Sequence, residues 1–348
     1  MLSAKNAGID CYLTKEVPLP FKTAGALVFK NQAQFNPLKF INSIVGDLTV
    51  FENTPALKII GNRVLTPYGM IRAKHIVIAT HYPFVNFPGE NFLKMSQERS
   101  YVVAFENSSF PSDSTFIGLE NDTLSFRRYQ KYVLLGGGNH RTGELRGNPY
   151  KMLERKAYEL FNNPQIKYRW SAQDCITLDG MPYIGRMKSG GDNIYIATGF
   201  NKWGITSSMV SANIISDLIC NVRNCNAEVF SPERFNLSAS VKNIIENTKE
   251  TVKGFSAYLL PSFASIKSIK KGEVKEFVTD GNFAGAYRDH DGKIYIVSLT
   301  CPHLKCKLKW NSAEKSWDCP CHGSRYDYKG NLIDNPAQHS SIRISKID

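Results

Sequence analysis

Four residues with metal-binding side chains lie in two short segments of the last fifty residues. Cys301 and His303 are one residue apart, and after a gap of fifteen residues Cys319 and His322 form a second pair. Cysteine thiolates and histidine imidazoles are common ligands of zinc and of iron. Two loops that each supply one thiolate and one imidazole therefore predict a metal centre, and tetrahedral zinc could use the same four ligands.

Each segment also carries a cysteine that a four-ligand site does not need. Cys306 ends the first segment, CPHLKC, and Cys321 lies inside the second, CPCHGS. Because one surplus cysteine lies on each loop, the two could bridge the loops and close the site. This feature distinguishes the pattern from a plain zinc site.

The two segments resemble those of the Rieske family, and the stretch from about residue 255 to residue 348 is similar to a whole Rieske domain. The resemblance implies one [2Fe–2S] cluster. It assigns Cys301 and Cys319 to one iron, and His303 and His322 to the other.

The same resemblance implies a disulfide between Cys306 and Cys321. It also places Ser324 and Tyr326 where high-potential members carry hydroxyl donors to the cluster and to a ligand sulfur. Such donors stabilise the reduced, more negative state, so we expect a potential in the upper part of the range from about −150 to +300 mV. The alternative is that both hydroxyls only satisfy the loop backbone.

Two positions depart from the Rieske pattern. Lys305 stands where the family favours Gly, and Pro302 stands where Thr is frequent. Gly accepts a positive φ without cost, whereas Lys would be strained there. The charge of Lys305 would favour reduction of the cluster, and we expect the cluster to bind despite both departures.

Three segments of the first two thirds resemble flavoenzymes of the D-amino-acid-oxidase-like class, which includes the glycine and sarcosine oxidases. A bacterial subgroup of this class carries a C-terminal Rieske domain. The segments are HIVIATH at 75–81, LDGMPYIG at 178–185 and YIATGFNKWG at 195–204. Their resemblance implies FAD contacts at Thr80, Gly180, Gly199, Lys202, Trp203, Gly204, Ile205 and Thr206.

One part of the flavoenzyme pattern has no counterpart in the sequence. No GxGxxG occurs, and the only run of three glycines, 136–138, lacks the spacing of a phosphate loop and predicts a tight β-bend. We interpret the chain as one that starts inside the family pattern: a truncated reading frame, a fragment or half of a split protein. FAD is a possible cofactor, but we expect this chain alone not to bind it tightly.

Four side chains are candidates for chemistry on a substrate. Arg99 and Arg127 could bind a carboxylate, His140 could transfer protons, and Lys202 would lie near the flavin. For the arginines a surface or interdomain salt bridge is an equally good reading, and a structural role is the better one for His140.

The elements that must position these residues follow from apolar patterns. Short β-branched runs predict strands at 73–80, 132–135 and 193–198, and helical spacing predicts helices at 152–161 and 207–219, the latter capped by Thr206 or Ser207. After them, strands are expected at 276–278, 283–288 and 293–299, with a hairpin turn at 289–292.

The fold class is therefore α/β (α+β): an incomplete FAD-dependent oxidoreductase domain with mixed and antiparallel sheets, followed by a small all-β Rieske domain. We place the first domain at 1–225, a helical linker at 226–260 and the Rieske domain at 261–348.

The chain has 348 residues and a net charge of +12. Its basic residues are interleaved with acidic ones, which argues against a nucleic-acid partner. Without a secretory signal or a run of about 18 apolar residues, it is expected to be cytoplasmic.

In the intact family system, an amine or amino acid would pass a hydride to FAD. Single electrons would then reach the cluster and an external acceptor, either a protein or a quinone-like molecule. A competing hypothesis is an electron-transfer module whose flavin domain is a non-catalytic scaffold. A structural zinc or regulatory protein is a third.

Overall fold

The structure is a computed structural model. It describes residues 1–85, 91–107, 110–111, 114–119, 123–145, 147–187, 191, 193–234, 266–279 and 281–340. The chain divides into two compact units. Unit 1 comprises Met1–Asn53, Tyr101–Gly138 and Pro149–Ser171, and unit 2 comprises Thr54–Ser100, Asn139–Asn148 and Ala172–Asp348.

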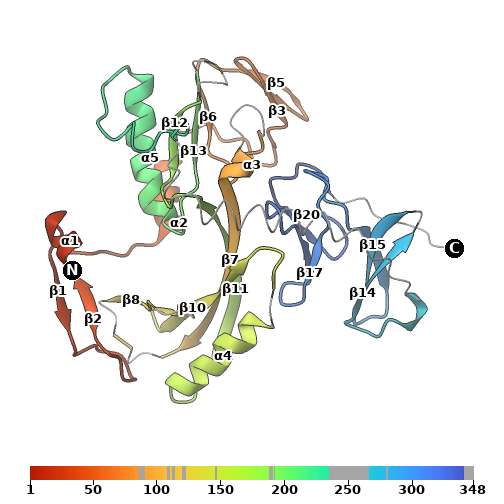
Figure 1. Ribbon diagram of the computed structural model, residues 1–348, viewed down its shortest axis with the longest axis horizontal. Coiled ribbons are helices and arrows are strands. Elements are labelled where there is room, and N and C mark those ends of the chain that lie inside the picture. Colours follow the sequence, from red (N-terminus) through yellow and green to blue (C-terminus); the bar gives the residue numbers. More distant parts are fainter. Residues whose placement is uncertain are drawn as a thin grey trace. The chain divides into compact units, whose positions relative to one another are not determined.

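The described elements alternate between helices and strands up to residue 219 and are almost all strands after residue 266 (Figure 1). In chain order they are α1 (Leu2–Asn6), β1 (Cys11–Thr14), β2 (Ala26–Phe29), α2 (Pro37–Ile44), β3 (Lys58–Ile60), β4 (Arg63–Thr66), β5 (Gly69–Arg72), β6 (Ile76–Ile78), α3 (Asn91–Lys94), β7 (Met95–Glu106), β8 (Thr115–Ile117), β9 (Ser125–Tyr129), β10 (Tyr132–Arg141), α4 (Pro149–Leu160), β11 (Ile166–Thr177), β12 (Tyr183–Arg186), β13 (Ile194–Thr198), α5 (Gly204–Ile219), the 3₁₀ helix η3 (Ile266–Ser268), β14 (Val274–Thr279), β15 (Asn282–Arg288), β16 (Ile294–Ser298), β17 (Lys309–Asn311), β18 (Ser316–Asp318), β19 (Arg325–Asp327) and β20 (Leu332–Asp334).

The largest sheet has five strands in the order β11-β7-β10-β9-β8. In β7 every second residue from Met95 to Val103 is buried, and the residues between them are half-buried. This is the two-residue period of a strand with one covered face. The glycine run 136–138 lies inside strand β10, so the prediction of a tight β-bend there is wrong. A Cβ at Gly138, which has a φ of 65°, would lie 2.8 Å from Cβ of Pro149, so the glycine lets the start of α4 approach the strand.

The core of unit 1 contains a cluster of phenylalanines. The ring of Phe161, just after α4, lies 4.8 Å from Phe105, 5.9 Å from Phe110 and 6.2 Å from Phe126, between ring centroids. Phe21, from the loop between β1 and β2, contacts Phe126 at 5.4 Å. Aromatic burial therefore joins the N-terminal hairpin to the strands of its own unit.

A second, mixed sheet in unit 2 has the order β12-β13-β6. β13 pairs antiparallel with β12 and parallel with β6. All five residues of β13 are buried, as a short β-branched run with both faces covered requires. Helix α5 packs against this sheet through Ile214 and Ile215. It begins at Gly204 without a side-chain cap, so the prediction that Thr206 or Ser207 caps it is wrong.

The strands after residue 266 form two antiparallel sheets, β14-β15-β16 and β17-β18-β19-β20. Residues 289–292 form the expected turn, since Asp289 N–H donates to the carbonyl of Lys293 at 2.9 Å. The core between these sheets is centred on fully buried Trp317. The prediction of an α/β domain with mixed and antiparallel sheets followed by a small all-β domain is confirmed.

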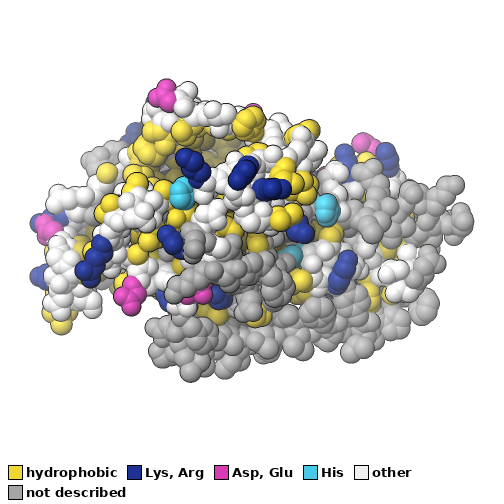
Figure 2. Space-filling view, turned by 90° about the horizontal axis from the view of Figure 1, so that it is seen from above, with side chains coloured by type: hydrophobic (Ala, Val, Ile, Leu, Met, Phe, Trp, Pro, Cys, Tyr) yellow, Lys and Arg dark blue, Asp and Glu magenta, His cyan; other side chains and the backbone are white. Residues whose placement is uncertain are grey.

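Most of the predicted linker, 226–260, lies outside the described residues, as does the boundary at 260–261, so the three domain limits stay predictions. No helix in the described ranges is both long and apolar enough to cross a membrane. On the face seen in Figure 2, Lys and Arg side chains are spread among hydrophobic and other side chains.

The packing around Trp317 gives a stability prediction. A Cβ at Gly285 would lie 2.4 Å from the Trp317 ring and 2.8 Å from Leu299. Gly285→Ala should therefore lower the free energy of unfolding by about 1–3 kcal/mol, the usual cost of overpacking. The urea midpoint followed by tryptophan fluorescence measures this loss. The matched control is Gly46→Ala, where a Cβ meets nothing within 4 Å. Equal midpoints for the two variants would contradict the packing argument.

Candidate metal centre

The first candidate ligand loop, residues 299–308, follows β16 and closes on itself. Lys305 N–H donates to the carbonyl of Cys301 at 2.9 Å, and Cys301 N–H donates to the carbonyl of Cys306 at 2.9 Å. This tight turn gives Lys305 a φ of 62°. The expectation that a lysine is strained at this position is confirmed, because a left-handed conformation is unfavourable for a residue with a Cβ.

The second loop, residues 319–324 between β18 and β19, repeats the same turn. Gly323 N–H donates to the carbonyl of Cys319 at 2.9 Å, and Cys319 N–H donates to the carbonyl of Ser324 at 2.8 Å. Gly323 has a φ of 81° and stands where the first loop has Lys305. The two loops thus use one backbone design, and only the second has the residue that this design favours.

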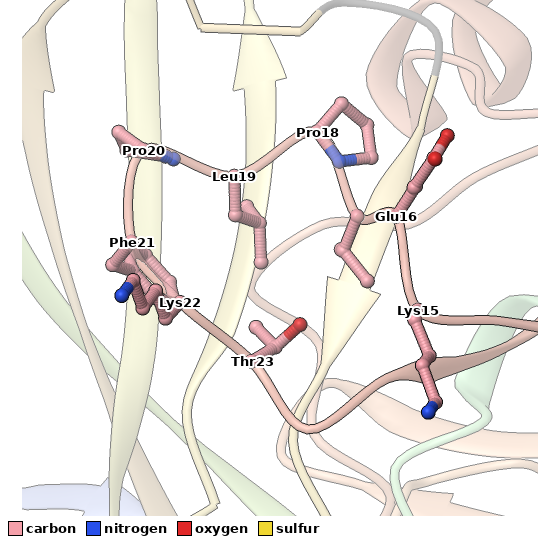
Figure 3. Close-up of a pocket in the computed structure, with 9 residues that line it drawn as sticks. Lys15, Glu16, Pro18, Leu19, Pro20, Phe21, Lys22 and Thr23 are labelled. Atoms are coloured by element: carbon pink, nitrogen blue, oxygen red, sulfur yellow. The ribbon is translucent and has the colours of Figure 1, made fainter.

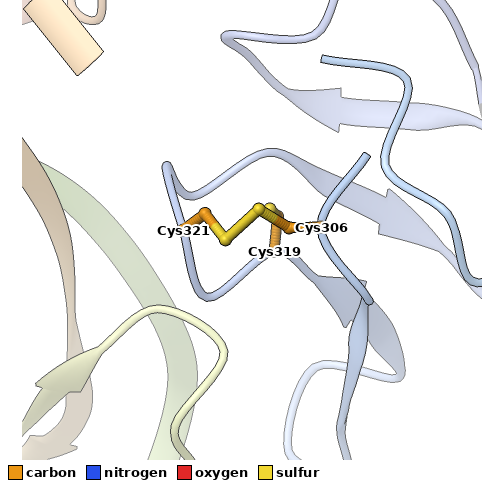
Figure 4. Close-up of side chains that lie close together, drawn as sticks. All are labelled: Cys306, Cys319 and Cys321. Atoms are coloured by element: carbon orange, nitrogen blue, oxygen red, sulfur yellow. A yellow bond between two sulfur atoms is a disulfide. The ribbon is translucent and has the colours of Figure 1, made fainter. Parts of the chain in front are cut away.

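A disulfide between Cys306 and Cys321 joins the two loops (Figure 4). Cys319 lies beside it, and the sulfur atoms of the three cysteines are within 4.8 Å of one another. Since two of these sulfurs are bonded to each other, Cys319 is the member of the trio with a thiol to offer a metal. The disulfide fixes one loop against the other, as the resemblance to the Rieske family implied.

The four predicted ligands lie on these two disulfide-linked loops. Cys301 and Cys319 are fully buried, and the imidazoles of His303 and His322 lie 5.0 Å apart between ring centroids, with their planes at 88°. The Cys319 thiol donates to Cys301, which lowers the pKa of Cys301 to about 6 and raises the pKa of Cys319.

The histidines are in the form that binds metals. Burial lowers the pKa of His303 to about 4. Burial, helped by the charges of His303 and Arg141, lowers the pKa of His322 to about 3. Both imidazoles are neutral near pH 7, as ligation requires. Two buried cysteines and two neutral imidazoles on disulfide-linked loops have the donor chemistry of a centre with two thiolate and two imidazole ligands.

Two hydroxyl groups border the ligand sulfurs, as the resemblance implies. Tyr326 Oη lies 3.7 Å from Cys301 Sγ, and both residues are fully buried. Ser324 Oγ accepts from the N–H of Ala337 at 3.0 Å, which leaves its own hydrogen to be donated elsewhere. Both hydroxyls help to lower the pKa of Cys301, after the larger effect of Cys319.

The residues with implied FAD contacts come from three segments at one edge of the mixed sheet. Thr80 follows β6, and Gly199, with a φ of 72°, follows the parallel strand β13. Gly180 lies in the turn before β12, whose first residue, Tyr183, pairs with Thr198 at the same edge. Helix α5 starts there, with exposed side chains at Lys202, Trp203, Ile205 and Thr206 and exposed backbone at Gly204.

Three of the four substrate candidates have partners within the chain. Arg99 is buried and forms ion pairs with Glu314 (3.3 Å) and Asp334 (3.5 Å). Lys202 pairs with Glu98 at 2.9 Å. His140 in β10 makes a 2.7 Å contact with the Arg141 carbonyl, and burial lowers its pKa. Arg127 is exposed on β9 in unit 1. Their roles toward a substrate stay predictions.

A hollow of about 840 Å³ in unit 1 is lined by residues 15–23 (Figure 3). All of its lining comes from the single loop between β1 and β2. Active sites usually gather polar groups from several elements. This hollow therefore adds no catalytic or metal-binding group to those above.

Several residues around the centre were missed by sequence reasoning. Gln97, Gln173 and Asn335 contact the second loop or its neighbours, and none of them was given a role from the sequence. Arg141 directly follows His140, which was considered for proton transfer, but it was not assigned to the cluster.

Paired cysteine and histidine loops, joined by a disulfide and mounted on two small antiparallel sheets, define a protein of the Rieske iron–sulfur class. The Rieske [2Fe-2S] domain model matches residues 261–346, and the model of the FAD dependent oxidoreductase family (DAO) matches residues 3–218. The chain belongs to this FAD dependent oxidoreductase family and carries a Rieske [2Fe-2S] domain. It holds the features of a [2Fe–2S] protein, as predicted.

Several known proteins are similar to all or part of this chain. YhfW of Bacillus subtilis (strain 168), named for a Rieske 2Fe-2S iron–sulfur centre, is 34% identical over 95% of this chain and 68% of its own length. The cytochrome b6-f complex iron-sulfur subunit of Nostoc punctiforme is 47% identical over 16% of this chain and 34% of its own. Glycine oxidase from Geobacillus kaustophilus has 18% identity and a TM-score of 0.45 over 53% of each chain. This chain thus spans about half of that flavoenzyme.

The Tyr326 hydroxyl gives a prediction about potential. Reduction makes the sulfurs more negative, so a donor to Cys301 binds the reduced state more strongly. Tyr326→Phe should lower the midpoint potential by roughly 40 mV, the equivalent of about 1 kcal/mol for one electron. Protein-film voltammetry measures the shift. The control is Tyr328→Phe, whose ring packs against Tyr287 and Tyr295. An unchanged midpoint in Tyr326→Phe would show that the hydroxyl serves only the loop.

The left-handed Lys305 gives a prediction that separates strain from charge. Lys305→Gly should raise the free energy of unfolding by about 0.5–1 kcal/mol, because glycine relieves the backbone strain but gains entropy in the unfolded chain. Lys305→Ala keeps the strain and should bring no such gain. Both variants remove the positive charge, so both should lower the midpoint potential alike. Urea unfolding tests the strain, and voltammetry tests the effect of the charge. Equal free energies of unfolding for the two variants would show that the backbone at position 305 is not strained.

Proposed function

We propose that the chain is a redox protein that binds a [2Fe–2S] cluster through Cys301, Cys319, His303 and His322. Electrons from a flavin at the edge formed by β6, β13 and α5 would reach this cluster and leave to an external acceptor, a protein or a quinone-like molecule. The substrate of the flavin site would be an amine or an amino acid.

One contact supports the transfer step most directly. Asn335, in the loop after β20, donates through Nδ2 to the carbonyls of Thr80 (3.2 Å) and Tyr82 (3.3 Å), at the end of the implied flavin strand. The backbone carbonyl of Asn335 accepts from Gln97 Nε2 at 3.3 Å. Gln97 Nε2 also donates to the His322 carbonyl at 2.7 Å. Hydrogen bonds therefore connect the flavin edge with a proposed iron ligand inside unit 2.

The flavin edge has the features that an anionic ring system needs. Helix α5 is sixteen residues long, and its first turn is exposed, so its free N–H groups and positive dipole end can face a ligand. Trp203 and Ile205 are 64% and 41% exposed beside it, offering apolar cover. When bound, FAD would accept a hydride, and the cluster would divide the pair into single electrons.

A second candidate function also has support. The sequence lacks the GxGxxG unit that grips the FAD pyrophosphate. In addition, the charge of Arg99 is already balanced by Glu314 and Asp334. These observations favour an electron carrier whose flavin-type domain is a scaffold, and cofactor content distinguishes the two functions.

The first test is chemical analysis of the full chain, purified and reconstituted anaerobically. We expect two irons and two acid-labile sulfides per chain, with a reduced-state EPR signal. Cys301→Ser should abolish all three. Cys220→Ser, which changes an exposed cysteine, should leave them intact. Zinc without sulfide would rule out the cluster and with it the whole proposal.

The second measurement is flavin content and cluster reduction by substrate. Bound FAD, with cluster bleaching on addition of an amine or amino acid, supports the oxidoreductase. A protein with a full cluster, no flavin absorbance and no reduction by such substrates supports the carrier.

A further inference from the structure

The second ligand loop is held by side chains from the large sheet. Arg141, at the end of β10, donates from Nε to the carbonyl of Pro320 (3.2 Å) and from Nη2 to that of Cys321 (3.4 Å). The turn that follows β10 lies beside this loop in Figure 4. One guanidinium thus binds the two residues directly after Cys319.

Two glutamines bind the next two carbonyls of the loop. Gln97 of β7 donates to the His322 carbonyl at 2.7 Å, and Gln173 of β11 donates to the Gly323 carbonyl at 2.9 Å. Four consecutive carbonyls, those of residues 320–323, therefore accept from three side chains on three adjacent strands. All of these residues belong to unit 2.

The two glutamines are themselves braced. Gln173 Nε2 also donates to Gln97 Oε1 at 2.6 Å, and Thr142 Oγ1 donates to Gln173 Oε1 at 2.8 Å. Thr142 N–H donates to the Gln97 carbonyl at 2.9 Å. Gln97 is only 2% exposed. Such a buried, mutually satisfied network fixes its members in one arrangement.

Backbone on both sides is adapted to this contact. A Cβ at Gly143 would lie 2.6 Å from the nitrogen of Pro320, and a Cβ at Gly323 would lie 2.7 Å from Cβ of Gln97. Both glycines have positive φ, 81° in each case. The approach of the loop to the sheet is thus closer than any other residue would allow at either position.

We infer that Arg141, Gln97 and Gln173 are positioning residues that hold the second ligand loop, and that the Arg141 cation raises the reduction potential of the cluster. Reduction adds one negative charge in a buried site, where a nearby cation acts through little water. Donors on the loop carbonyls also withdraw negative potential from the cluster. The oxidoreductase part of the chain would thus help to set the potential of its Rieske domain.

The inference requires the cluster but neither FAD nor a substrate. It can therefore fail while the proposed flow of electrons holds, and it can hold in a pure electron carrier. Cys301→Ser in the previous section tests the cluster itself, whereas the variants below keep all four proposed ligands.

The test is the midpoint potential of the full chain with its cluster reconstituted. In Arg141→Gln the equilibrium constant for reduction should fall about tenfold, which equals 59 mV for one electron. Arg141→Lys keeps the charge and should stay within about threefold of the wild type. Gln173→Leu removes one donor and should lower the constant about two- to threefold, with a changed EPR line shape.

The control is Gln338→Ala, which removes a hydrogen bond from Gln338 to the Ala56 carbonyl without touching residues 319–324. Its potential and EPR spectrum should match the wild type. Wild-type potentials in both Arg141→Gln and Gln173→Leu overturn the inference. If Arg141→Gln does not retain its cluster, the other two variants decide. A wild-type midpoint potential in Gln173→Leu overturns the inference. A tenfold fall of the equilibrium constant for reduction in Arg141→Lys also overturns it.

Discussion

The chemistry of this chain depends on a covalent constraint, the disulfide that joins two loops of identical backbone design. Each loop alone is a short turn with one cysteine and one histidine available. A cluster needs all four side chains at fixed separations, and fixing them without a bridge would cost backbone entropy for every residue. The bridge from Cys306 to Cys321 restricts these loops before any metal arrives.

The base of the second loop is held by a different interaction. Asp318 and Arg325, the residues on either side of it, are register partners in the sheet and form a buried ion pair at 3.0 Å. Removing charges from water is costly unless every polar atom is satisfied. Here Asp318 also accepts from Ser316 and Asn311, and Arg325 also pairs with Asp334. The loop is thus closed covalently at its tip and electrostatically at its base.

The sequence predicted what depends on local spacing. The spacing of cysteines and histidines within each loop predicted a metal centre, and the resemblance that this spacing carries implied the disulfide and the positive φ at Lys305. Strands β13 and β15 likewise follow from short apolar runs. The start of α5 was misplaced because Trp203 precedes it with no capping side chain, so the usual signal is missing.

Contacts between distant segments could not be predicted in this way. Gln97 and His322 are 225 positions apart, and a glutamine in an alternating strand has no feature that marks it as the partner of a metal-binding loop. The same holds for Arg99, where an arginine that could bind a carboxylate turns out to face two carboxylates of the chain itself. In both cases the tertiary fold selects one partner from several that the side-chain chemistry allows.

The contacts made by the Rieske domain bear on how the two matched families work in one chain. If the domain were only tethered, its surroundings would be water, and its potential would be its own. Instead, Asn335 binds the segment after β6, and Arg99 bonds across to Glu314. Gly143 approaches Pro320 so closely that a methyl group would not fit. Contacts of this kind place fixed dipoles and a cation against the loop that carries Cys319 and His322. Whether it is a catalyst or a scaffold, the flavin-type domain therefore supplies the side chains that contact the loop carrying two of the proposed cluster ligands.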